Sequence, residues 1–158
     1  MHRLLNVLGV VGVVSGVTLQ PDIAAQSSTA SIKVCELLPR AEVKKLINGN
    51  QVFDMMAPEE EPLGNYGSSC NYPGVMIQVM PFLQSTIDGA RKRGRLEPVS
   101  GVGDEAWLYE NPAGYAELYV RIDKRFLTLQ RDIGMGQTLA SVRPGVMALA
   151  NALVARLR

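Results

Sequence analysis

Two adjacent carboxylates in the segment SGVGDEAW, residues 100–107, are the most chemically suggestive feature of the chain. Asp104 and Glu105 follow two glycines, and a phosphate-binding loop with this composition would repel its ligand. A catalytic pair must flank one bond, whereas neighbours entering a strand point to opposite faces. We therefore interpret the segment as a glycine turn that leads into a strand, with Trp107 or Leu108 packing inward.

The only histidine of the chain is His2, which belongs to an N-terminal segment with the layout of a secretory signal peptide. Residues 1–25 combine a basic start at Arg3, an apolar run over residues 4–19 and a small-residue end at Ala25. The apolar run falls short of the roughly 20 residues that a membrane-spanning helix needs. We expect cleavage after Ala25, with an uncleaved anchor as the alternative.

A mature chain without histidine excludes most familiar hydrolase mechanisms. It offers no Ser-His-Asp or Cys-His relay and no histidine ligand for zinc. The formal net charge of +1 gives no field that would attract nucleic acid. We predict an exported protein, periplasmic or extracellular, that is not an enzyme, has no cofactor or metal, binds no nucleic acid and has no transmembrane segment in its mature form.

Cys35 and Cys70 are the only two cysteines, and an exported chain meets an oxidising compartment. We predict one disulfide between them, which the chain-entropy model credits with about 3.8 kcal/mol. A redox-active pair is the competing interpretation. Such pairs normally sit in a Cys-x-x-Cys motif, which this spacing does not provide.

The pattern of apolar residues predicts an α+β fold in which an antiparallel sheet carries helices packed on one face. In 115–122, apolar residues alternate with Glu117, Tyr119 and Arg121, the period of a half-buried strand. We expect a flexible leader over 26–31 and a single domain over 32–158. The domain contains two halves of similar β-β-β-α plan. The predicted strands are 51–56, 68–72, 75–82, 106–110, 115–122 and 125–131, with an exposed loop over 57–68. The predicted helices begin just after Cys35, at 85 and at or near Pro144, and the segment 133–143 is either a loop or an extra helical turn.

The strongest local charge feature is the basic cluster Arg91, Lys92, Arg93 and Arg95. Cations at this place suit the end of a helix, because they complement its dipole. The alternative is a patch that docks to an anionic partner, such as phosphorylated lipid headgroups or an acidic protein.

Three weaker signals have simpler structural interpretations. The run 59–61 of three glutamates could hold calcium or solubilise a loop. The glycines at 134 and 136 lack the rest of a dinucleotide-binding fingerprint. The methionines could bind Cu(I), but core packing explains them better.

Several short motifs together resemble small exported bacterial α+β domains of unknown function, many of which are envelope lipoproteins or sensor-like proteins. The motifs are a cysteine ahead of LLPRAEV, a second cysteine in SSCNYPG, the GVGDEAW segment and a terminal helix of the ALANALVARL type. The resemblance covers residues 34–157. It implies an extracytoplasmic domain with one disulfide and supplies no catalytic residues. This chain departs from the lipoproteins because no lipidation cysteine follows its apolar run.

These observations favour an exported, non-catalytic module that binds a small apolar ligand, a lipid or a protein partner. Binding would use the sheet face or the gap beneath the helices. One alternative is an unusual histidine-free hydrolase, and the other is a purely structural envelope protein. The groups available to such a hydrolase are Asp104, Glu105, Glu110, Lys44, Lys45 and Ser100.

Overall fold

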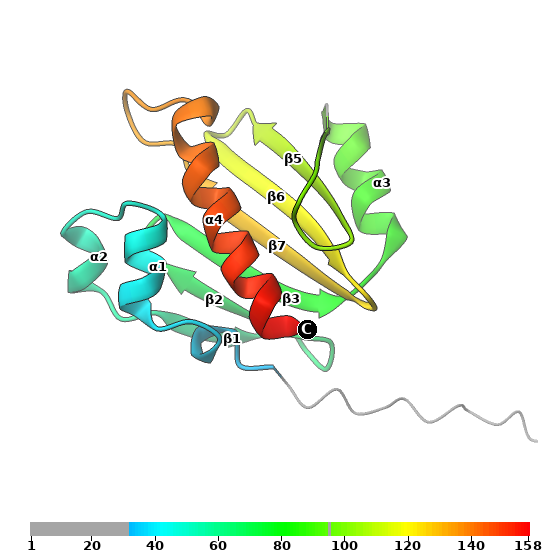
Figure 1. Cartoon of the computed structure of the whole chain (residues 1–158), viewed down its shortest axis with the longest axis horizontal. Coiled ribbons are helices and arrows are strands. Elements are labelled where there is room, and N and C mark those ends of the chain that lie inside the picture. Colours follow the sequence, from blue (N-terminus) through cyan, green and yellow to red (C-terminus); the bar gives the residue numbers. More distant parts are fainter. Residues whose placement is uncertain (1–31, 95) are drawn as a thin grey trace, which may run out of the picture.

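A computed structural model describes residues 32–94 and 96–158 of the chain (Figure 1). The predicted signal peptide, the leader and Arg95 lie outside the described residues. Within the described ranges, none of the helices has the length and apolar character needed to cross a membrane.

The described residues form a seven-stranded sheet with helices on its surfaces. The helices are η1 (Val34–Glu36), α1 (Arg40–Leu46), α2 (Val52–Met55), α3 (Gln84–Arg93) and α4 (Leu139–Leu157). The strands are β1 (Glu59–Pro62), β2 (Ser68–Tyr72), β3 (Val75–Pro81), β4 (Glu97–Val99), β5 (Glu105–Asn111), β6 (Tyr115–Ile122) and β7 (Arg125–Asp132).

All neighbouring strands pair antiparallel in the order β1-β2-β3-β7-β6-β5-β4. Two meanders, β1 to β3 and β4 to β7, therefore meet where β3 pairs with β7 in the middle of the sheet. Each meander is followed by a helix, as the predicted β-β-β-α halves require. The second half has β4 in addition.

The predicted α+β architecture is confirmed, because α1 and α4 pack together on one face of the antiparallel sheet. In Figure 1 these two helices lie in front of the strands, and we call this side of the sheet the front face. The apolar positions of β6 point to this face, where they join the main core with residues of α4. They are Ala116, Leu118, Val120 and Ile122.

Helix α4 packs along the front face through a stripe of buried residues that recurs every three or four positions. These residues are Val142, Val146, Leu149, Ala150, Leu153, Val154 and Leu157. The helix begins at Leu139, five residues before Pro144, so the segment 133–143, which the sequence left open between a loop and an extra helical turn, ends in the first turn of this helix. A capping box explains the earlier start: Thr138 and Ser141 each satisfy the other's backbone amide.

Helix α3 packs against the opposite side of the sheet, which we call the reverse face. Its buried Ile87 and Ala90 join a second, smaller cluster with Tyr109, Tyr119 and Phe126. On β6, Tyr119 alternates with the residues that face α4. The two halves thus resemble each other in strand order but send their helices to different faces.

The prediction of a strand over 51–56 is wrong, because this segment forms the single turn α2. The Asn50 side chain accepts a 3.0 Å hydrogen bond from the backbone amide of Val52 and starts the turn. Only Phe53 is buried, and its ring stacks on Tyr72 at 5.4 Å. One inward aromatic is enough to anchor a turn, and the neighbouring Met55 remains exposed.

Both edge strands escaped the sequence analysis because their composition is unusual for strands. β1 lies within the predicted loop and consists of three glutamates and a proline. β4 has three residues and contains Pro98. Short edges with charge or proline resist pairing with another chain.

Candidate functional site

The segment 100–107 is a turn into β5, in agreement with its structural interpretation. Gly101 and Gly103 have φ values of 82° and 59°. A Cβ on Gly103 would meet the Val120 side chain and lie 2.6 Å from the Arg121 carbonyl oxygen. The second glycine is therefore required by both its conformation and its close contact with β6.

The two carboxylates of this segment have different structural partners. Asp104 accepts a 2.6 Å hydrogen bond from the backbone amide of Asp123 and pairs with Arg158 at 3.1 Å. The hydrogen bond from Asp123, followed by the nearby arginines, lowers the pKa of Asp104. Glu105 pairs instead with Arg121 across the β5–β6 ladder. Together the two carboxylates tie this turn and Arg158 to the sheet. They form no shared catalytic site.

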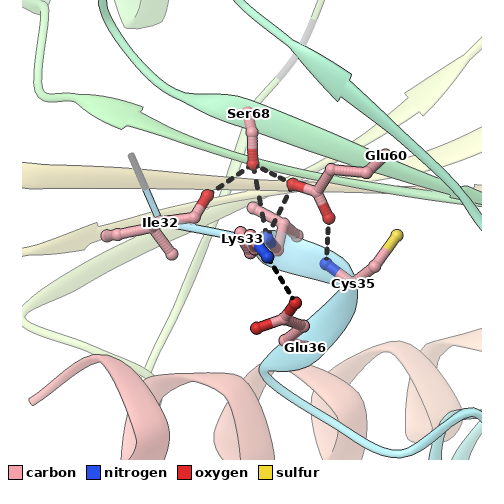
Figure 2. A network of polar contacts seen from close by, with 7 residues as sticks. Ile32, Lys33, Cys35, Glu36, Glu60 and Ser68 are labelled. Atoms are coloured by element: carbon pink, nitrogen blue, oxygen red, sulfur yellow. Dashed lines mark hydrogen bonds and ion pairs between the residues drawn. The ribbon is translucent and has the colours of Figure 1, made fainter. Parts of the chain in front are cut away.

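The predicted disulfide between Cys35 and Cys70 is present, with Cα atoms 5.1 Å apart. Glu60 on β1 holds the adjoining start of η1. Its two carboxylate oxygens accept hydrogen bonds from the backbone amides of Val34 at 2.8 Å and Cys35 at 2.6 Å. Figure 2 shows the Ser68 hydroxyl between this carboxylate and the backbone carbonyl of Ile32.

Glu60 and the two cysteine sulfurs lie within 4.8 Å of one another. The sulfurs are bonded to each other, however, so they do not act as thiolate ligands here. The three glutamates considered for calcium also separate: Glu60 faces η1, while Glu59 and Glu61 are paired opposite reverse-face residues of β2. Glu60 therefore points away from the other two glutamates, and its contacts stabilise the fold.

The basic cluster lies at the end of α3, as a helix-end interpretation requires. The Arg91 guanidinium lies 6.0 Å from the Trp107 ring centre and 3.7 Å from Asp88. Arg93 donates a 3.4 Å hydrogen bond to the Tyr119 hydroxyl. Two of the three described cations thus have partners within the chain, and Lys92 is exposed.

The remaining groups considered for a histidine-free hydrolase are dispersed. Lys44 of α1 pairs with Asp54 of α2 on the helical side of the molecule. Ser100 is exposed in the turn before β5, and Glu110 is exposed near the end of that strand. Within residues 32–94 and 96–158, no hydrogen bond or ion pair joins these groups to Asp104, so they provide no nucleophile with an adjacent base.

The reverse face has an open half next to the part that α3 covers. The strands β2, β3, β7 and β6 contribute polar side chains and one methionine to it, in alternation with the core residues of the front face. We call this set the open face, and its residues are Ser69, Asn71, Met76, Gln78, Thr128, Gln130 and Glu117. Most are half-buried; Ser69, Thr128 and Glu117 are buried.

A chain of hydrogen bonds crosses the border between α3 and the open face. Glu117, at 9% exposure, accepts a 2.8 Å hydrogen bond from the Asn111 amide and another from the Tyr119 hydroxyl. Burial and then the neighbouring Glu117 carboxylate raise the pKa of Tyr119 to about 12. Sequence reasoning missed this group because the alternation in β6 predicted a solvent-facing position for Glu117.

Two hollows are the best formed among the described residues, and both are shallow. One, of about 350 Å³, lies between α1 and the start of α4 and is lined by Asn48, Arg131 and Ser141 among others. The other, of about 460 Å³, lies at the end of α3 beside Tyr109 and Leu139. Both mix polar and apolar linings and open to solvent, so neither is an enclosed apolar cavity.

Comparisons with known proteins add no further constraint. No family model matches the chain, and neither the curated proteins nor the solved structures contain a significant match.

Proposed function

We propose that this protein is an exported, non-catalytic binding module that docks a protein partner on the open face. The observation that carries the proposal is the difference between the two faces. The front face is filled by α1 and α4 with apolar contacts, whereas the α3 cluster on the reverse face includes none of the seven open-face residues. Amide and hydroxyl groups with a methionine suit a hydrated protein interface.

The other ligands considered from the sequence find less support. A small apolar ligand needs an enclosed apolar cavity, and the two hollows are open and partly polar. A lipid surface would be expected to attract free cations, yet Arg91 and Arg93 contact groups of the same chain. A protein partner is therefore the occupant that fits the described surface best.

The edges of the sheet favour docking by face over addition of a strand. β1 carries three glutamates with Pro62, and β4 is short and contains Pro98. Such edges are poor templates for an added strand. Export is supported by the disulfide, which forms and persists in oxidising compartments.

Site-specific photo-crosslinking in the native host tests the proposal. The crosslinking residue replaces Gln78 or Gln130 on the open face, and Asn151 on the exposed side of α4 serves as the matched control. We expect one adduct of constant mass from both open-face positions and none from Asn151. Absence of an open-face adduct, or the same adduct from all three positions, would contradict the proposal.

A further inference from the structure

Glu117 occupies the centre of a cross-strand row on the reverse face. It lies directly opposite Tyr109 on β5 and Gln130 on β7. Its two known side-chain partners, Asn111 and Tyr119, are neutral hydrogen-bond donors. The carboxylate is therefore buried among neutral polar and aromatic groups.

Among the described residues, no lysine or arginine lies within 4.0 Å of the Glu117 carboxylate. Exposed glutamates of the same sheet, in contrast, form ion pairs with arginines: Glu105 pairs with Arg121, and Glu97 pairs with Arg143 at 2.8 Å. Arg93 comes nearest through the network, but it donates to the Tyr119 oxygen. A buried carboxylate without a cation is costly, and it gains most from a cation that arrives when water is excluded.

We propose that the partner presents a lysine or arginine side chain to Glu117; this inference rests on the proposed function. Glu59 and Glu61 extend the negative charge of this face towards β1, because they pair with reverse-face positions of β2. The amides of Gln78 and Gln130 can bond the polar groups around the incoming cation. The contact segment of the partner is therefore basic.

Random peptides displayed on phage provide the probe. Peptides selected on the wild-type protein are measured by fluorescence anisotropy, and the side-chain amide signals of Gln78 and Gln130 report where they bind. We expect enriched peptides to share one basic residue and to shift these signals. The substitution Glu117→Gln should weaken binding by about tenfold or more, whereas Glu42→Gln on α1 should not.

The coupling between protein and peptide identifies the contact. Replacing the shared basic residue of the peptide by glutamine should cause the same loss, and combining it with Glu117→Gln should add little. The inference would be overturned by peptides that shift the two glutamine signals, contain no basic residue and bind Glu117→Gln as tightly as the wild type. That result would leave the proposed function intact. Peptides that never shift these signals would contradict both.

A second variant keeps the inference testable where Glu117→Gln does not fold. Gln130→Lys places a cation directly opposite Glu117, and such a cross-strand pair should raise the melting temperature. It should also abolish binding of the basic peptides, because the internal lysine occupies their site. The neutral control Gln130→Met should not raise the melting temperature, and it should weaken peptide binding without abolishing it. Undiminished peptide binding to Gln130→Lys would overturn the inference.

Discussion

The carboxylate of Glu117 accepts a hydrogen bond from the hydroxyl of Tyr119, two residues further along β6, and both side chains are buried on the reverse face. The contact ties the α3 cluster to the open face. It also holds the phenol in its protonated form, because an ionised Tyr119 would lie beside a second negative charge.

Tyr119 should therefore titrate late and make folding sensitive to alkali. Its folded pKa of about 12 lies above the ordinary value of 10, so this stabilisation is complete below pH 10 and is lost as the pH rises towards 12. Ultraviolet difference titration of the wild type and Tyr119→Phe measures the group by subtraction. A difference spectrum that titrates near pH 10 would show that Tyr119 is not held this way.

Two glycines of the turn before β5 should differ in their tolerance of a side chain. Gly101→Ala places Cβ in open space, so its cost should be the positive-φ strain of about 1 kcal/mol. Gly103→Ala should cost about 2 kcal/mol more, because its Cβ also clashes with β6. Urea denaturation of both variants gives the comparison. Equal losses would mean that the close approach to β6 is absent.

The carboxylate that caps η1 should contribute to stability, whereas its neighbour on β1 should not. Glu60→Gln removes charged acceptors from the amides of Val34 and Cys35 and should cost about 1.5 kcal/mol. Glu61→Gln is the matched control on the opposite side of the strand. Thermal unfolding with the disulfide intact measures both, and identical melting temperatures for the two variants would refute the capping role.

The basic cluster of α3 should not bind a lipid surface. Arg91, Lys92 and Arg93 are all exposed, but Arg91 and Arg93 are held against Trp107 and Tyr119. We expect no cosedimentation with vesicles of phosphatidylcholine and phosphatidylserine even at low ionic strength, where attraction is strongest. Binding that disappears with added salt and with Lys92→Gln would instead restore the anionic-surface hypothesis.

Local patterns predicted the features that depend on short-range chemistry. The alternation in β6 follows directly from residue type, and the two residues left between the predicted strands 115–122 and 125–131 form the tight turn in which Asp123 has a φ of 53°. The disulfide follows from the only two cysteines and the expected compartment. These signals require no knowledge of what packs across the sheet.

The candidate site could not be predicted in the same way, because burial on the reverse face depends on distant segments. Glu117 and Tyr119 occupy the polar half of an alternating strand, and α3 arrives from earlier in the chain to bury the second of them. Tyr109 and Tyr119 were the available signal, since the first lies opposite Glu117 and the second donates a hydrogen bond to its carboxylate. The turn α2 was missed for a related reason, as Phe53 is fixed by Tyr72 of another element.

Oxidative footprinting of methionines in the unmodified protein tests the central claim most directly. Met76 lies on the open face, and Met55 is 80% exposed on α2. If a partner covers the open face, Met76 will oxidise more slowly in the intact cell envelope than in the purified protein, while Met55 will oxidise equally in both. Equal oxidation of Met76 in the two settings would contradict docking on this face.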